Sequence, residues 1–434
     1  MIRKIALTFL VLLLFSNTSF AKIKSVEEQK LEWNDWLEDL KEEMLDKGIS
    51  KKTIDKAYKD DYFHEIKEVV LQDKKQAEFI LTSDKYINKL ITQNKVNLAR
   101  EHYKNLTPKY QRISDTYGVP LHYLISFWAV ETHFGYNKGK YHLIDSLTNL
   151  SYKNRRATFF KKELYNILKI MDNYNLDSNK IKGSWAGAMG HFQFMPSTYN
   201  AYAVDFDNDG IADIWDNFDD AIASAANYLS ELGWKADEPW GQEVILPWNF
   251  DYSLVGAKKY KKISEWIKIG ITDIKGKKLK LPNDASATIT LPDGRRGRAY
   301  ITLSNFRRIM IWNRSTNYAL AIVTLADYIK NNTQFSPLKE KHQYKLTDED
   351  ILTVQRFANK IIKAQLKEDG RLGSKTTTAV KKLQKKWKLP EDGMPDYQLL
   401  FKIKNFKSWK DFRVSPQPRK PRPPVNSPKI AKSN

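Results

Sequence analysis

The chain has 434 residues, of which 41% are hydrophobic and 12% aromatic, so it can form two or three domains and is too apolar for global disorder. It contains no cysteine, which excludes disulfides and lipid attachment through a cysteine. Its formal net charge of +21 is typical of proteins that meet anionic polymers or surfaces.

The first residues have the pattern of a secretory signal peptide. Arg3 and Lys4 precede an apolar run at 5–15, and a cleavage-site pattern, Ser-Phe-Ala, follows at 19–21. The run is too short to span a bilayer, although a non-cleaved anchor would look the same. We therefore expect an exported, soluble protein whose mature form begins near Lys22. Anionic wall polymer or a membrane surface suits that destination better than nucleic acid.

Helical periodicity dominates the chain that follows. Apolar residues recur at helical spacing over 27–117, 121–171, 219–233 and 318–332, and a Gly- and Asp-rich stretch at 183–217 interrupts them. Residues 285–304 alternate apolar and polar side chains around a Pro-Asp-Gly turn, which predicts a β-hairpin. The pattern predicts a mainly α fold with a small β element.

The C-terminal part divides into a small unit and a tail. At 344–406, two similar segments each place Asp-Gly before an apolar helical pattern, which by periodicity alone indicates only a small helical bundle. Residues 413–434 are rich in proline and basic residues and contain no acid. They cannot bury enough apolar surface to fold, so we expect an extended tail that is either simply solvated or binds the wall.

Glu131 is the single carboxylate in an apolar and aromatic run at 125–135. If this run is helical, Glu131 lies on the same face as Leu124, Phe127 and Trp128. Burial would raise the pKa of such a carboxyl group toward about 6, which suits a general acid at neutral pH. A structural glutamate that pairs with a buried arginine or caps a neighbouring helix fits the same pattern.

The segment GSWAGAMGHFQFMPSTY at 183–199 places three glycines among aromatic residues, Gln193 and Met195. Glycines let the backbone approach a ligand closely, and aromatic faces suit sugar rings. A tightly packed junction between a helix and a loop would have the same composition.

Acids at Asp205, Asp207 and Asp209 followed by Gly210 match the first half of an EF-hand loop. The next ligand in that pattern is a backbone carbonyl, here that of Ile211. The twelfth position is Asp216 instead of the usual glutamate, so the closure is ambiguous. An Asp-rich turn without metal is the alternative.

Four segments carry a resemblance to a known family. AVETHFG at 129–135, the motif GSWAGAMGHFQFMPSTYNAYAVDFDNDGIADIWDN at 183–217 and DAIASAANYL at 220–229 resemble the lytic murein transglycosylase B family. NFRRIMIWNRSTNYALAI at 305–322 is similar to its last core motif. The likeness covers roughly 27–335. It implies a lysozyme-like α+β catalytic core that cleaves the MurNAc–GlcNAc β-1,4 bond of peptidoglycan without consuming water.

The implied chemistry gives Glu131 a catalytic role. Glycosidases ordinarily need two carboxylates, and we identify no convincing partner for Glu131 in the sequence. In a transglycosylase, Glu131 would protonate the departing glycosidic oxygen and then act as base on the C6 hydroxyl of the same MurNAc. Intramolecular attack leaves a 1,6-anhydroMurNAc end, so the enzyme would be a carbon–oxygen lyase acting on a polysaccharide.

The resemblance also implies substrate-binding residues, namely Ser184, Gln193, Tyr228, Asn313 and Tyr318. Position 312 departs from the family, because related sequences often have tyrosine where this chain has Trp312. Tryptophan keeps a stacking face and lacks the hydroxyl, so we expect Trp312 to lie outside the catalytic set.

In the resembled family the closing carboxylate of the metal loop comes late, which points to Asp220, with Asp219 as its neighbour. The implied ligands of a structural Ca²⁺ are Asp205, Asp207, Asp209, Ile211 and Asp220. We expect no organic cofactor.

The expected organisation is a signal peptide at 1–21, a catalytic domain at 22–335, a peptidoglycan-binding domain at 344–406 and a disordered tail at 413–434. The binding domain is assigned by resemblance to the three-helix type. The expected partner is the peptidoglycan glycan strand, with weak contact to an anionic wall or membrane surface and none to nucleic acid. A periplasmic monomer that is not a lipoprotein is expected.

Three other hypotheses remain at this stage. A hydrolytic muramidase would use the same cleft but needs a second acid or a positioned water. A non-catalytic wall-binding protein would keep the fold without the acid. A nucleic-acid binder would explain the charge and the aromatic residues, but neither the export signal nor the aspartate loop.

Overall fold

A computed structural model of the chain describes residues 25–59, 69, 81–178, 181–247, 250–294, 297–338, 346–389, 391–395 and 397–407. The predicted signal peptide at 1–21 and the tail at 413–434 lie outside these residues. So does most of the helical pattern predicted between 60 and 80.

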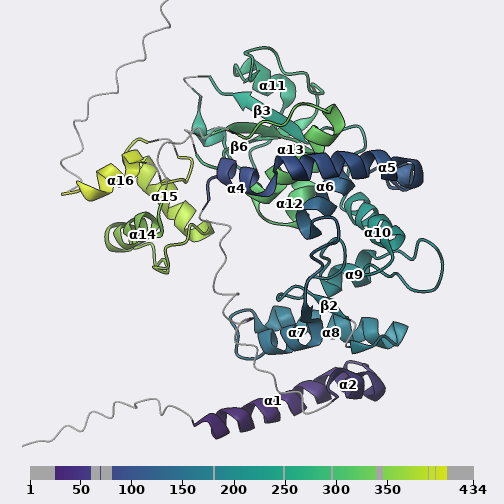
Figure 1. Cartoon of the computed structure of the whole chain (residues 1–434). Helices are drawn as coiled ribbons and strands as arrows, with labels where there is room; N and C mark the ends of the chain where they lie inside the picture. Colours follow the sequence, from purple (N-terminus) through teal and green to yellow (C-terminus); the bar gives the residue numbers. More distant parts are fainter. Residues whose placement is uncertain are drawn as a thin grey trace, which may run out of the picture.

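Two N-terminal helices lie beside a second helical pair (Figure 1). They are α1 (Val26–Asp46) and α2 (Lys51–Ala57), and the second pair is α7 (Leu143–Ser151) and α8 (Ala157–Tyr174). Ser50 caps α2, and Asp172 of α8 accepts a hydrogen bond from Thr53 at 2.6 Å and another from Ser50. These bonds fix α2 on α8.

Helix α6 (Leu121–Thr132) forms the centre of the main core. It contacts α5 (Gln93–Tyr117), α10 (Phe218–Glu231) and α13 (Thr316–Asn331), and α4 (Ser83–Leu90) covers α13 from another side. Every residue from Leu121 to Ala129 is buried. The predicted apolar stripe is thus a helix that is buried all round, because neighbours cover each of its faces.

Five short strands form an antiparallel sheet in the order β4-β6-β7-β3-β5. The predicted hairpin is present as β6 (Ser286–Thr290) and β7 (Ala299–Thr302). Strands β3 (Gly241–Ile245), β4 (Lys261–Lys262) and β5 (Thr272–Asp273) extend it. Strands β4 and β5 are too short to show alternation in the sequence, and β3 does not alternate between buried and exposed residues. Helix α11 (Ile263–Lys268) shares a second core with this sheet.

The C-terminal unit has three helices and its own core: α14 (Asp348–Ile362), α15 (Ser374–Lys386) and α16 (Tyr397–Lys404). Each Asp-Gly segment is held by a buried glutamine on the preceding helix. Gln355 accepts from the Gly370 N–H at 3.0 Å, and Gln384 accepts from the Gly393 N–H at 2.8 Å. The two segments, which are similar in sequence, therefore also form the same local structure.

The described part of the chain is mainly helical with small antiparallel sheets, as the sequence predicts. Within that part, none of the helices is both long and apolar enough to cross a membrane.

Candidate active site

Glu131 lies in the last turn of α6, where its side chain is half-buried. Two side chains from the other end of the catalytic region donate to its Oε1 atom. Trp312 donates from Nε1 at 3.0 Å, and the Tyr318 hydroxyl donates at 2.5 Å. Both donors therefore hold the same oxygen of the Glu131 carboxylate.

The chain turns sharply directly after Glu131. His133, Phe134 and Gly135 have φ values of 49°, 61° and 84°, all in the left-handed region. The Phe134 N–H donates to the Trp128 carbonyl at 3.2 Å, which closes the helix. A Cβ at Gly135 would lie 2.6 Å from the His191 ring, so only glycine fits. The turn therefore brings the loop after α6 against the glycine-rich segment.

A tight connection between α12 (Ser304–Trp312) and α13 places the two donors. Asn313 accepts the Ser315 N–H at 3.2 Å, and Ser315 in turn accepts the Tyr318 N–H at 3.2 Å as the cap of α13. Because both caps are local, the positions of Trp312 and Tyr318 relative to each other are set by this turn.

An aromatic cluster surrounds the Trp312 indole. Ring centroids lie 4.5 Å away for Phe127, 4.9 Å for Tyr228 and 5.4 Å for Phe194. Tyr228 also stacks on Tyr202 at 4.5 Å. The partly buried indole therefore packs against three protein rings at the edge of the main core.

The glycine-rich segment is folded on itself. Ser184 accepts the Ala188 N–H at 3.0 Å, and a Cβ at Gly183 would lie 2.2 Å from the Ala188 carbonyl oxygen. Gln193, which has a φ of 53°, donates to the carbonyls of Lys138 and Gly190, both at 3.1 Å. Its amide thus ties the segment to the loop that follows Glu131.

His191, in the glycine-rich segment, has a neutral side chain. Its Nδ1 accepts from the Trp128 indole at 3.0 Å. Burial and the nearby Lys138 charge lower the pKa of His191 to about 4. At neutral pH it therefore acts as a hydrogen-bond acceptor and carries no charge.

The structure brings some of the predicted site residues together. Glu131 and Tyr318 are in contact, and Tyr228 joins them through Trp312. Ser184 and Gln193 lie in the glycine-rich segment, and Asn313 caps the turn before α13. Trp312, which the sequence analysis left out, contacts Glu131 directly. Its indole N–H is a hydrogen-bond donor, which the sequence analysis missed because it considered only the absent hydroxyl.

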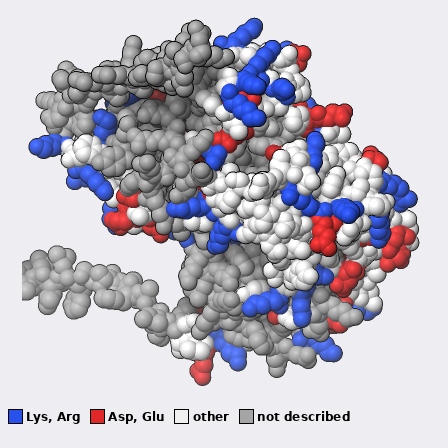
Figure 2. Space-filling model, turned by 45° about the horizontal axis from the view of Figure 1, so that its top comes forward, with Lys and Arg blue, Asp and Glu red and all other residues white. Residues whose placement is uncertain are grey.

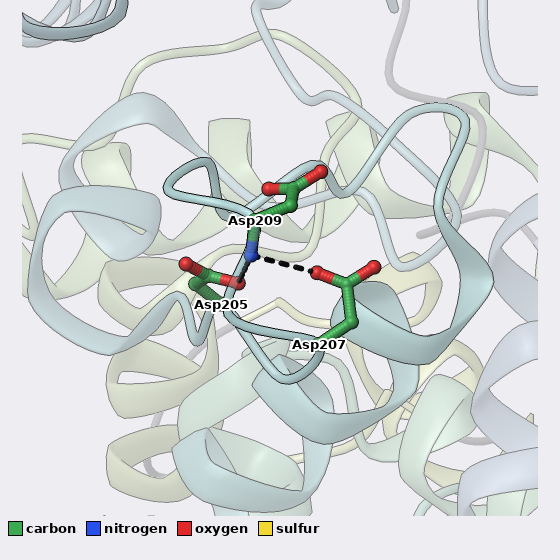
Figure 3. A group of neighbouring side chains, drawn as sticks. All are labelled: Asp205, Asp207 and Asp209. Atoms are coloured by element: carbon green, nitrogen blue, oxygen red, sulfur yellow. Dashed lines mark hydrogen bonds between the residues drawn. The ribbon is translucent and has the colours of Figure 1, made fainter.

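The aspartate loop gathers its first three acids. One carboxylate oxygen each from Asp205, Asp207 and Asp209 lies within 4.8 Å of the others, and Figure 3 shows the three side chains around one turn of backbone. The Asp209 N–H donates to Asp205 at 3.1 Å and to Asp207 at 3.2 Å, and the Gly210 N–H donates to Asp205 at 2.8 Å. This donor set of hard oxygens fits a Ca²⁺ ion.

The three acids considered for closing the loop are not members of this group of three. Asp220, the predicted ligand, is fully buried, and its two oxygens accept the N–H groups of Phe206 and Asp213, each at 2.8 Å. It therefore organises the loop from within and is not part of the group of three. Asp219 pairs with Lys109 at 2.6 Å, and Asp216 pairs with Lys138 at 3.3 Å.

Charge is spread over the surface that Figure 2 shows, where Asp and Glu side chains lie among the Lys and Arg side chains. On this face the described basic residues do not form one continuous stripe of the kind that follows a nucleic-acid backbone.

Comparison with known proteins defines the class. Residues 32–327 match the Transglycosylase SLT domain family, and residues 347–403 match a family of peptidoglycan binding domains. The chain belongs to the SLT transglycosylase family. This membership confirms the family, the enzyme class and the lysozyme-like, mainly α fold that the sequence motifs indicate.

Particular relatives extend this result. The membrane-bound lytic murein transglycosylase B of Escherichia coli K12 is 36% identical over 252 residues, which are 56% of this chain and 66% of that protein, just under two thirds of its length. The structure of SltB3 from Pseudomonas aeruginosa in complex with NAG-anhNAM-pentapeptide is 33% identical, with a TM-score of 0.78. The match covers 86% of this chain and 99% of that one.

A third relative is an Escherichia coli lytic transglycosylase in complex with calcium. It is 29% identical with a TM-score of 0.59, and the match covers 68% of this chain and 92% of that one.

Proposed function

We propose that this protein is a peptidoglycan lytic transglycosylase that cleaves the MurNAc–GlcNAc β-1,4 bond and leaves 1,6-anhydroMurNAc ends. The observation that carries the proposal is the convergence of Trp312 and Tyr318 on one oxygen of Glu131 within a fold of the SLT family. The similar SltB3 structure contains an anhydro sugar, which is the product expected from this chemistry.

Glu131 performs both proton transfers. In its protonated form it gives a proton to the glycosidic oxygen as the C1–O bond breaks and positive charge develops on the MurNAc ring. The resulting carboxylate then removes the proton from the C6 hydroxyl of the same sugar, whose oxygen bonds to C1. The proton returns to Glu131, so water is not consumed and the enzyme is regenerated.

The tethered C6 hydroxyl makes a second protein carboxylate unnecessary, because the nucleophile is already part of the substrate. Hydrogen bonds from Tyr318 and Trp312 stabilise the carboxylate form, which is the form that acts as base. Ser184, Gln193, Tyr228 and Asn313 lie on the elements that surround this position, and we assign them to substrate binding.

The two domains have different roles. Residues 22–335 form the catalytic domain and residues 344–406 bind peptidoglycan, which raises the effective concentration of the catalytic domain on an insoluble polymer. The basic tail at 413–434 adds a weak attraction to anionic wall groups.

The protein acts at the cell wall. The N-terminal signal pattern supports export to the periplasm, where we expect a soluble monomer. Asp205, Asp207 and Asp209, with the Ile211 carbonyl, hold a structural Ca²⁺ that stabilises the loop without taking part in proton transfer. The calcium complex of the similar Escherichia coli enzyme supports this assignment.

The test is mass spectrometry of sacculi digested with the mature protein and with Glu131→Gln. We expect anhydro-muropeptides from the wild type and none from the variant, which keeps the size of the side chain and removes its acidity. Reducing MurNAc ends would instead identify a hydrolytic muramidase. Binding without release by both proteins would identify a wall-binding protein.

A further inference from the structure

We propose that Trp312 is a positioning residue for Glu131, which it holds through a hydrogen bond from its indole N–H. The inference rests on the proposed function, because it assigns Glu131 the acid and base roles. It concerns how this particular chain orients that acid.

The donor geometry supports a specific contact. Trp312 Nε1 lies 3.0 Å from Glu131 Oε1, a normal length for a hydrogen bond from N–H to a carboxylate oxygen. The two residues are 181 positions apart in the chain, so tertiary packing alone makes this contact. Tyr318 donates to the same oxygen, so the carboxylate is held from two helices.

Packing prevents the indole from turning away. Phe127 comes from α6, Tyr228 from α10 and Phe194 from the glycine-rich segment, and their rings lie at interplanar angles of 42°, 36° and 70° to the indole. Rings held on several sides sit in a single rotamer. The direction of the N–H is therefore fixed before substrate arrives, which is the condition for preorganised catalysis.

A fixed donor acts on both steps of the proposed reaction. It holds one oxygen of Glu131 in place, and it stabilises the charged form of the carboxyl group. Loss of the donor should raise the pKa of Glu131 and allow its side chain to rotate. The first step needs the protonated form, so the high-pH limb of the rate profile should then move to higher pH.

The other titratable groups around α6 are the same in the wild type and in the Trp312 variants. Titratable side chains that face α6 from the packed elements include Tyr318 on α13, Tyr228 on α10 and Lys95 on α5, whose Nζ donates to the Ala129 carbonyl at 3.2 Å. His102 on α5 and His191 also contact Trp128 of α6. Substitution of Trp312 leaves all of these side chains in the chain. A shift of the profile can then be assigned to the missing indole N–H.

The experiment compares Trp312→Phe, which removes the donor, with Trp312→His, which returns a ring N–H. A matched control is Trp240→Phe, because Trp240 also donates its indole N–H to a carboxylate, Asp327, at 3.1 Å, outside the site. The readouts are the pH profile of anhydro-muropeptide release and the titration of Glu131 by carbon-13 NMR of glutamate-labelled full-length protein. The Glu131 signal is assigned by its loss in Glu131→Gln.

For Trp312→Phe we expect a fall in rate of about tenfold or more and an upward shift of about one pKa unit in both readouts. Trp312→His should recover part of the rate, and Trp240→Phe should change neither the profile nor the Glu131 titration. An unchanged Glu131 titration in folded Trp312→Phe would overturn the inference. An inactive wild type would refute the proposed function, and the NMR titration would still decide the role of Trp312.

Discussion

The Tyr318 hydroxyl lies 2.5 Å from Oε1 of Glu131, although the two residues are 187 positions apart in the chain. A hydrogen bond to a charged partner contributes about 1.5–3 kcal/mol. If this bond persists through the reaction, Tyr318→Phe should lower the rate of anhydro-muropeptide release about 10- to 100-fold. Binding to sacculi should be unchanged.

Tyr58→Phe is the matched control for this variant. It also removes a buried hydroxyl, which bonds to Thr148 at 3.1 Å on the far helical pair. Equal rates for Tyr318→Phe and wild type, with both proteins folded, would show that the hydroxyl does not contribute to the reaction.

Ca²⁺ should stabilise the protein through the aspartate loop. Extracellular Ca²⁺ modules bind with a Kd on the order of 10⁻⁴–10⁻³ M, so about 10 mM Ca²⁺ should add about 1.4–2.7 kcal/mol to the free energy of unfolding. Thermal unfolding with Ca²⁺ and with chelator measures this gain. Asp205→Asn should remove most of it.

Asp216→Asn, which changes an exposed acid just outside the group of three, should keep the gain. If the Ca²⁺-dependent shift is the same in Asp205→Asn as in the wild type, the ion binds elsewhere.

Acid should destabilise the fold through His122. Burial, with a smaller effect from Lys330, lowers the pKa of His122 to about 4, against about 6.5 in an unfolded chain. The unfolded state therefore binds a proton first as pH falls. The stability from neutral His122 is complete above about pH 6.5 and decreases toward pH 4, by about 3 kcal/mol in total.

Denaturant unfolding of wild type and His122→Gln between pH 7.5 and pH 4 checks this window. The difference in unfolding free energy between the two proteins should change with pH only below about 6.5. Parallel curves over the whole range would mean that His122 titrates normally in the folded protein.

The C-terminal unit should depend on Gln355. This buried side chain accepts from Asp369 at 3.1 Å and from Gly370 at 3.0 Å, so Gln355→Ala leaves two backbone N–H groups without that partner. We expect the unit to lose about 3 kcal/mol of stability. Sedimentation should show weaker retention on sacculi, while cleavage of soluble glycan fragments continues.

Thr353→Ala changes an adjacent part of the same helix, where the hydroxyl bonds to the Glu349 carbonyl on the exposed face, and it should leave retention intact. Full retention by a Gln355→Ala protein whose C-terminal unit has unfolded would remove the case for wall binding by residues 344–406.

Substitution of Gly183 should destabilise the protein, because the backbone of another residue lies too close for a side chain. A Cβ there would meet the Ala188 carbonyl oxygen at 2.2 Å, whereas a Cβ at Gly373 would meet nothing within 4 Å. Gly183→Ala should therefore destabilise the protein by about 3 kcal/mol, and Gly373→Ala should be nearly neutral. Melting temperatures of the two variants give the comparison, and equal values would show that the segment can relax.

The sequence by itself determined the structural features that depend only on residues close together in the chain. Helical spacing identified the long helices, alternation around Pro-Asp-Gly identified the β6–β7 hairpin, and the spacing of Asp205, Asp207 and Asp209 identified the turn that gathers them. These features are local because helix period, turn chemistry and metal-loop spacing involve residues a few positions apart. The family motifs are local in the same sense.

Tertiary structure decided the rest. Strands β4 and β5 have two residues each, and the five residues of β3 do not alternate between buried and exposed. Strands β3 and β4 pair with the two edges of the hairpin, and β5 pairs with β3. The two hydrogen bonds that the buried Asp220 accepts, from the Phe206 and Asp213 N–H groups, also depend on the fold. The environment of Glu131 is the clearest feature that the sequence did not predict, because its donors Trp312 and Tyr318 belong to helices far along the chain. Hydrogen bonds between distant residues depend on how helices pack, and the order of residues does not record that packing.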